Sequence, residues 1–216
     1  GEFLTIFNSI EGYLFQPFFQ QTAILSFWAK SPKTGIHCVS LSNEVDRSYV
    51  AEYFVSAANT WQQFNIGVTF NYVGGTFNYT TGLGMRINFA LAAGTTFQTA
   101  NPYSWQPGVF YATANQQNLL DTIGNTFRVT DVSLQAGVIP SPFDRIPFDI
   151  ALLRAQRYFF SSFPYGTIPA QGAAATNPLQ LIADRTWSPD NFTLNAPQNG
   201  SGVIAFPTPM RILNPT

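Results

Sequence analysis

Hydrophobic and polar residues alternate along much of the chain between residues 22 and 134, and turn-forming residues interrupt the alternation at short intervals. The alternation is clearest over residues 84–91, where every second side chain is apolar and would enter a core, while the intervening ones would face solvent. The strands predicted by this pattern are 22–29, 36–41, 49–55, 61–70, 84–91, 108–113 and 126–134.

Short strands at regular spacing, separated by turns rich in Gly, Asn, Ser and Pro, are typical of a β-sandwich or barrel. Residues 22–57 indicate a meander of antiparallel strands, because the polar segments 31–35 and 42–47 between the apolar runs have turn chemistry. No segment before residue 140 has the pattern of a helix. We therefore expect a mainly β protein.

The pattern changes near residue 140 and predicts a helix at about residues 147–161. Pro147 suits its first turn, where the missing N–H costs nothing, and Asp149 would lie near the positive end of the helix dipole. One apolar stripe at helical spacing can pack on the chain itself, whereas Ile150, Leu153 and Phe160 point elsewhere. This second apolar face indicates either a partner chain or a position between the two parts of this chain.

Shorter strand candidates follow the helix at residues 179–183, 191–194 and 202–206, between turns rich in Pro, Gly and Asn. With the helix they predict a second part, residues 139–216, that contains a small β-rich module. Leu213–Thr216 contains no closing signal, so we expect this module to continue beyond Thr216 in the intact protein.

Charged residues make up 10% of the chain, well below the roughly 25% typical of soluble domains, so neutral polar groups must cover its surface. The net charge is −1, and no run of Lys or Arg is present. Nucleic acid and anionic membrane surfaces both require clustered positive charge, and a spanning helix requires about 20 consecutive apolar residues. We expect neither nucleic-acid binding nor membrane insertion.

Residues suited to catalysis are few. His37 is the only histidine and Cys38 the only cysteine, and neighbours in one strand point to opposite faces, which disfavours a nucleophilic pair. The acids are scattered except for Glu44 and Asp46, which a solvated turn explains better than a glycosidase dyad. The sequence contains no phosphate-binding loop, nucleophile elbow or metal-spaced histidine cluster. These observations predict that the protein is not an enzyme.

Aromatic residues make up 16% of the chain, and two of them stand in an unusual place. Tyr103 and Trp105 lie in a loop rich in Pro, Asn and Gly, with Asn101 and Gln106 beside them. Loops at the ends of sandwiches carry binding residues; sugar rings stack on aromatic rings, and amides bond to their hydroxyls. These four residues predict a glycan-binding site. Trp105 as a cap on the end of the core is an equally good explanation of the same loop.

Asp131 lies in the middle of a predicted strand, where a buried carboxylate must be hydrogen-bonded or bound to a cation. Calcium prefers carboxylate and carbonyl oxygens, so one interpretation is a structural calcium site. The other is a structural aspartate with protein partners, as most buried polar groups have. We expect no other cofactor.

Several segments, taken in order, resemble one protein family. They are Ser9–Gly12, Leu25–Ser31, Ala58–Trp61, Gly82–Leu91, Phe127–Gly137, Pro142–Asp144 and Ala155–Phe159. Their order and spacing resemble the jelly-roll, carbohydrate-binding-like domain of bacteriophage tail-fibre and minor structural proteins, over residues 9 to about 160. Gln135 stands where that family usually has Glu, and Ala155 where it often has Cys. The family supplies no binding residue to carry over.

The resemblance implies a jelly-roll β-sandwich at residues 4–138 in a viral protein exposed on the virion, in contact with other virion chains and commonly trimeric. Ile150, Leu153 and Phe160 would then lie in the oligomer interface. With the neutral polar surface and the loop aromatics, the resemblance predicts non-enzymatic attachment of a phage-like particle to a host-surface glycan. The second hypothesis is a structural spacer or oligomerisation domain of a viral fibre with no ligand. The third and weakest is a polysaccharide-degrading enzyme.

Overall fold

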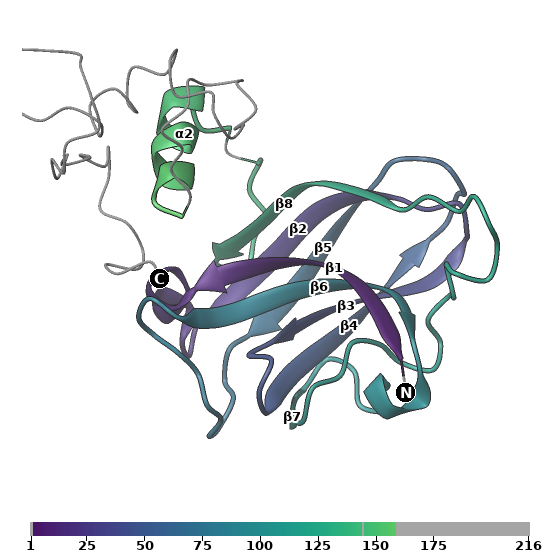
Figure 1. Cartoon of the computed structure of the whole chain (residues 1–216), viewed down its shortest axis with the longest axis horizontal. Helices are drawn as coiled ribbons and strands as arrows, with labels where there is room; N and C mark the ends of the chain where they lie inside the picture. Colours follow the sequence, from purple (N-terminus) through teal and green to yellow (C-terminus); the bar gives the residue numbers. More distant parts are fainter. Residues whose placement is uncertain (1, 144, 159–216) are drawn as a thin grey trace, which may run out of the picture. The chain divides into compact units, whose positions relative to one another are not determined.

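The computed structural model of the chain describes residues 2–143 and 145–158. The chain divides into two compact units, Gly1–Asp144 and Arg145–Thr216, with the boundary a few residues after the expected one. The first unit is a β-sandwich of two antiparallel sheets (Figure 1), and the described residues of the second contain one helix. The expected mainly β fold class is confirmed.

Eight strands form the sandwich. They are β1 (Phe3–Glu11), β2 (Thr22–Lys30), β3 (Gly35–Ser42), β4 (Arg47–Val55), β5 (Gln62–Thr69), β6 (Leu83–Ala93), β7 (Trp105–Pro107) and β8 (Arg128–Ala136). One sheet has the order β1-β6-β3-β4-β7 and the other the order β5-β2-β8. Every pair of neighbouring strands is antiparallel.

The strands β2, β3, β4, β5, β6 and β8 confirm six of the seven predicted strands. The prediction of a strand at residues 108–113 was wrong, since Ala112 forms only an isolated bridge to Gln98. These residues are apolar for another reason, because Tyr111 and Ala112 are buried on the outer face of the five-stranded sheet. The strands β1 and β7 were not predicted.

The predicted meander over residues 22–57 was also wrong. Strands β3 and β4 pair with each other in the five-stranded sheet, but β2 lies in the other sheet, between β5 and β8. The short polar connection after β2 therefore crosses from one sheet to the other. Because packed sheets lie only about 10 Å apart, a connection of this length can serve either a hairpin or a crossing.

A short helix, α1 (Gly12–Phe15), follows β1, so the prediction that no helix precedes residue 140 was wrong. Its first backbone N–H groups, those of Gly12 and Tyr13, donate to the carbonyls of Gly82 and Thr80, each at 2.9 Å. Single 3₁₀ turns lie at Gln16–Phe18 and Thr95–Phe97. Such brief turns are too short to produce a helical period in the sequence.

The main core fills the space between the two sheets. Phe27 of β2 is fully buried there, and its ring contacts those of Tyr53, Phe64 and Phe89, with centroids 4.9–5.5 Å apart. Met85, Ile87 and Phe89 of β6 enter this core, as their alternation predicted.

The opposite face of β6 was expected to meet solvent, but Asn88 and Ala90 are buried. Residues 94–119, which we call the cover segment, explain this difference. The side-chain amide of Gln116 donates to the Ala90 carbonyl at 3.0 Å, and the backbone N–H of Leu119 donates to the Leu91 carbonyl at 2.9 Å. The middle of β6 is therefore covered on both faces, so its apolar and its polar side chains both lie in buried surroundings.

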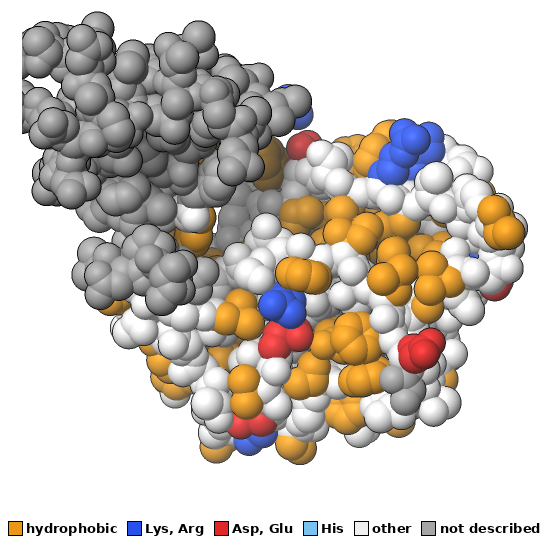
Figure 2. Space-filling model, viewed as in Figure 1, with side chains coloured by type: hydrophobic (Ala, Val, Ile, Leu, Met, Phe, Trp, Pro, Cys, Tyr) orange, Lys and Arg blue, Asp and Glu red, His pale blue; other side chains and the backbone are white. Residues whose placement is uncertain are grey.

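Strand β1 is the last strand of the five-stranded sheet, and among the described residues it pairs only with β6. Its apolar side chains are exposed, namely those of Phe3, Leu4, Ile6 and Phe7. Figure 2 shows hydrophobic side chains distributed among neutral polar groups on this face of the molecule, with few charged groups. The sparse charge agrees with the composition of the chain.

The helix α2 (Phe148–Gln156) belongs to the second unit and is shorter than the predicted 147–161. Pro147 occupies its N-cap position and Asp149 lies in its first turn. Ile150 and Leu153 are exposed, whereas Phe160 lies outside the described residues, as do the strand candidates after it. No helix in the described part of the chain is long and apolar enough to cross a membrane.

Candidate functional site

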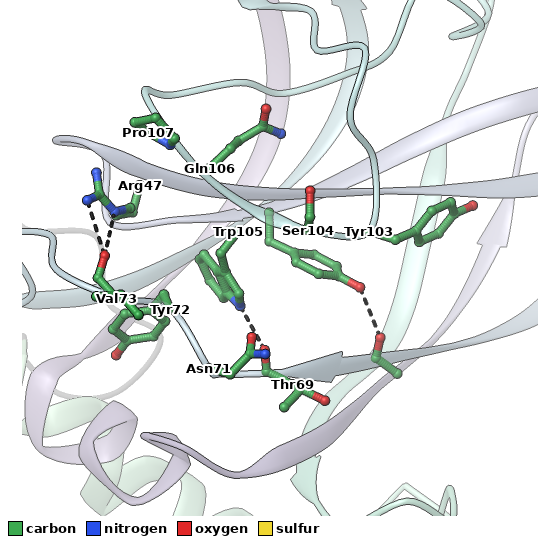
Figure 3. Close-up of a pocket in the computed structure, with 12 residues that line it drawn as sticks. Arg47, Thr69, Asn71, Tyr72, Val73, Tyr103, Ser104, Trp105, Gln106 and Pro107 are labelled. Atoms are coloured by element: carbon green, nitrogen blue, oxygen red, sulfur yellow. Dashed lines mark hydrogen bonds between the residues drawn. The ribbon is translucent and has the colours of Figure 1, made fainter.

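A groove of about 600 Å³ opens at the side of the sandwich where β5 and β7, the last strands of their sheets, come together. Residues 103–107 form one wall, Thr69 and residues 71–73 form another, and β4 contributes Arg47 and Tyr49 (Figure 3). We call this hollow the β5–β7 groove. It brings segments far apart in the sequence into one site.

Tyr103 is the exposed aromatic residue of the groove, with 55% of its surface accessible. Its backbone adopts a positive φ of 63°, and its N–H donates to the Val50 carbonyl at 2.7 Å. The phenol hydroxyl donates to the Glu52 carbonyl at 3.1 Å, and partial burial raises the pKa of Tyr103. The ring is thus held at both ends while much of its surface stays open.

Trp105 is half-buried and lies at the end of the core. Its indole N–H donates to the Thr69 carbonyl at 2.8 Å, and its ring lies 5.1–5.6 Å from the rings of Tyr49, Phe70 and Tyr72. The residue also lines the groove. Each of the two interpretations of Trp105, as binding platform and as core cap, therefore describes one part of its surroundings.

Gln106 lines the groove, but its amide is engaged within the chain. Its Oε1 accepts a hydrogen bond from the Thr99 hydroxyl at 2.7 Å, and its Nε2 donates to the Asn101 carbonyl at 3.2 Å. Asn101 does not line the groove; its carbonyl also accepts from the Ser104 hydroxyl at 3.1 Å. Of the four predicted glycan-binding residues, Tyr103, Trp105 and Gln106 are brought together, and Asn101 supports the loop that carries them.

The lining residues that were not predicted include Arg47, Tyr49 and Asn71. Arg47 enters the site because it pairs with Pro107 in the register between β4 and β7. In the sequence it belongs to a polar turn segment, and nothing near it indicates a site. Asn71 likewise stands in the connection between β5 and β6, outside any strand. Only the folded structure shows that Arg47 and Asn71 line the same groove as Tyr103.

Comparisons with protein-family models, with curated proteins and with solved structures each found no match.

Asp131 lies in β8 where its pairing with β2 shifts register between Ser26 and Trp28. Its φ is 51°, a left-handed conformation that Asp tolerates better than most residues, and register shifts of this kind are β-bulges. The bulge explains a carboxylate in the middle of a strand. No group of three His, Cys, Asp or Glu side chains in the described part of the chain is placed to hold a metal ion. A calcium ion at Asp131 stays a prediction.

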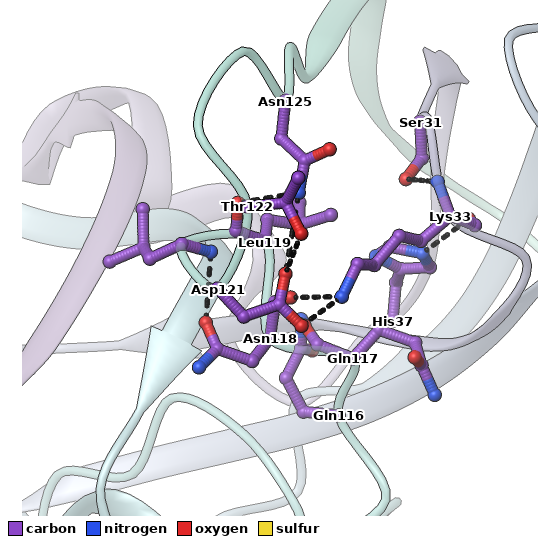
Figure 4. A network of polar contacts seen from close by, with 11 residues as sticks. Ser31, Lys33, His37, Gln116, Gln117, Asn118, Leu119, Asp121, Thr122 and Asn125 are labelled. Atoms are coloured by element: carbon purple, nitrogen blue, oxygen red, sulfur yellow. Dashed lines mark hydrogen bonds and ion pairs between the residues drawn. The ribbon is translucent and has the colours of Figure 1, made fainter.

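His37 and Cys38 face opposite sides of β3, as their adjacency predicted. His37 is fully buried, and its Nε2–H donates to the Lys33 carbonyl at 3.1 Å in the polar network of Figure 4. Cys38 lies instead in the cluster with Val50 and Ala90 under the cover segment. Burial raises the pKa of the Cys38 thiol, which makes it a poor nucleophile at neutral pH.

His37 should make the stability of the protein depend on pH. Burial lowers its pKa below the usual 6.5, the hydrogen bond to the Lys33 carbonyl opposes this, and the charge of Lys33 adds to it. Below about pH 6.5 the unfolded chain therefore binds a proton that the folded chain does not, so the free energy of unfolding falls with decreasing pH, by at most about 1.4 kcal/mol per pH unit. Urea denaturation at a series of pH values measures this slope.

The control is His37→Gln, which removes the only histidine and should give a flat profile between about pH 6.5 and 5. Asp46 and Asp121 have lowered pKa values, so the stability they contribute is lost only below about pH 3.8. A wild-type protein with no slope between pH 6.5 and 5, or a variant that keeps the slope, would contradict the assignment to His37.

The acids Glu44 and Asp46 are bound into the fold, and the prediction of a solvated pair was wrong for Glu44. Only 16% of the Glu44 side chain is exposed. Asp46 accepts hydrogen bonds from Asn43 and from the backbone and hydroxyl of Thr76, and these bonds, that of Asn43 first, lower its pKa. Neither acid lines the β5–β7 groove.

Proposed function

We propose that this protein binds a carbohydrate in the β5–β7 groove without catalysing a reaction. The observation that carries the proposal is the groove itself, which joins the open ring of Tyr103 and the side of Trp105 to neutral polar groups of Asn71 and Ser104. Small-molecule sites are concave and combine aromatic surface with a few polar groups that fix orientation. A sugar offers apolar C–H faces for the rings and hydroxyls for the polar groups.

Binding is favoured over cleavage by the residues of the groove. No described residue that lines it is Asp, Glu or His, whereas glycoside hydrolysis generally uses a pair of carboxylates. A polysaccharide-degrading enzyme is therefore the weakest candidate.

In the intact protein, carbohydrate binding would attach a phage-like particle to a host-surface glycan. This part of the proposal is supported by the resemblance of residues 9 to about 160 to phage tail-fibre domains and by the neutral polar surface. It makes the protein a virion component, in contact with other virion chains.

Tyr103→Asn should weaken binding of an identified glycan about twofold to twelvefold, because it removes a stacking ring worth about 0.5–1.5 kcal/mol. Asparagine tolerates the positive φ at this position, so the fold should be retained. A glycan array identifies the ligand, and isothermal titration measures the affinity. Trp105→Ala is a less informative variant, because Trp105 also packs on the core.

The matched control is Phe54→Asn, which removes an exposed aromatic ring of β4 that does not line the groove. It should bind the glycan as tightly as the parent. Undiminished binding by Tyr103→Asn would exclude the groove as the site, and a parent protein that binds no carbohydrate would exclude the function.

A second candidate function, a spacer or oligomerisation domain of a viral fibre, is favoured by β1. This edge strand is nine residues long and exposes Phe3, Ile6 and Phe7, and residues 3–10 contain no charge and no proline. Edge strands of sheets usually carry charged residues or proline, which prevent pairing with another chain. The occupant that fits β1 is a second copy of this chain, and Ile150 and Leu153 add exposed apolar surface on α2.

Light scattering on the sample used for titration separates the two functions. A stable oligomer, such as the expected trimer, that binds no saccharide would favour the assembly role. A protein that binds saccharide would favour attachment, whatever its oligomeric state.

A further inference from the structure

We infer that the carbohydrate bound in the β5–β7 groove is acidic, and that Arg47 binds its anionic group. The inference rests on the proposed function and names the ligand class of the same site. Of the described residues that line the groove, only Arg47 is charged. A neutral sugar would need no such cation.

The guanidinium of Arg47 is held in place by backbone carbonyls. Its Nη1 donates to the Asp46 carbonyl at 2.8 Å, and its Nη2 and Nε donate to the Val73 carbonyl at 3.2 and 3.4 Å. The two bonds to Val73 are drawn in Figure 3. A guanidinium has five N–H donors, so these three bonds leave two for a ligand.

No carboxylate of the described residues forms an ion pair with Arg47. The nearest acid in sequence, Asp46, directs its carboxylate to Asn43 and Thr76. Hydrogen bonds from Asn43 and Thr76 lower the pKa of Asp46 more than the charge of Arg47 does. The groove therefore contains a positioned cation whose charge is not cancelled by a close partner.

This arrangement favours an anion as part of the ligand. Arginine binds carboxylate, sulfate and phosphate oxygens through paired, charge-assisted N–H bonds. In the view of Figure 3, Arg47 and Tyr103 lie toward opposite ends of the groove, with Trp105 between them. We expect an oligosaccharide whose acidic unit lies at Arg47 and whose other rings lie along Trp105 and Tyr103.

The test compares glycans that differ only in their charged group. An array of matched oligosaccharides provides the probes: chains with a uronic acid, the same chains with that carboxyl reduced to an alcohol, and the same neutral chains carrying a sulfate. The carboxylated or the sulfated member should bind at least about tenfold more tightly than its neutral counterpart, and this preference should shrink as salt increases. Which of the two binds better identifies the anion.

Variants at Asn71 test the charge of the groove without disturbing Arg47. Asn71 lines the groove, is exposed, and makes no side-chain hydrogen bond to a described residue. Asn71→Asp should weaken binding of the acidic glycan about fivefold, and Asn71→Lys should strengthen it by a similar factor. The matched control is Asn8→Asp, which makes the same charge change on β1, where the side chain is exposed and outside the groove.

The outcomes separate the inference from the proposed function. Equal affinity for acidic and neutral glycans, or no response to either Asn71 variant, would overturn the acidic ligand while carbohydrate binding stands. Failure of every glycan to bind would overturn both.

Discussion

Glu44→Ala should lower the free energy of unfolding by about 3–5 kcal/mol, because it leaves a charged partner and several polar ones without their acceptor. One oxygen of Glu44 accepts hydrogen bonds from Ser42 and from Asn88, the latter at 3.1 Å. The other accepts from Arg86 at 3.1 Å and from Tyr111 at 3.0 Å. Burial, followed by the charge of Glu44, raises the pKa of Tyr111 to about 12, so the phenol stays protonated and donates.

Chemical denaturation measures the loss, and two variants control it. Glu44→Gln keeps one carbonyl oxygen as an acceptor and should cost less than Glu44→Ala. Glu2→Ala makes the same change at an exposed position and should alter stability by less than about 0.5 kcal/mol. A loss below about 1 kcal/mol for Glu44→Ala would show that this network contributes little to folding.

Gly12→Ala should lower the free energy of unfolding by about 3 kcal/mol, the upper end of the cost of overpacking. A Cβ atom at position 12 would lie 2.5 Å from the backbone nitrogen of Thr80 and 2.6 Å from the carbonyl oxygen of Asn78. Both are backbone atoms and cannot move aside as a flexible side chain would. Gly84→Ala should cost a similar amount, since its Cβ would lie 2.7 Å from the Cα of Gly12.

The matched control for these variants is Gly67→Ala in β5. A Cβ there would meet no atom within 4 Å, so the stability should change by less than about 0.5 kcal/mol. Equal stabilities of the Gly12→Ala and Gly67→Ala proteins in urea would contradict the close approach.

The strands that could be predicted are those in which one face is apolar and the other is more polar. In β6, Met85, Ile87 and Phe89 enter the core between the sheets, and their period of two was visible in the sequence. Strand β1 has no such contrast, because it exposes apolar residues along most of its length. Strand β7 is only three residues long, which is too short for any pattern.

The site was predictable only where its residues are close in sequence. Tyr103, Trp105 and Gln106 stand in one loop whose composition indicated binding, and all three line the groove. Arg47 lies far from them in the chain and reaches the groove through the pairing of β4 with β7.

The sequence by itself determined the mainly β class, the positions of six strands and the loop aromatics, because these depend on local alternation and turn chemistry. Only the tertiary structure decided which sheet β2 joins, that the cover segment buries the second face of β6, and that Arg47 meets Trp105 in one groove. Those features depend on strand register and sheet packing between distant segments, which the period of side chains along one strand does not encode.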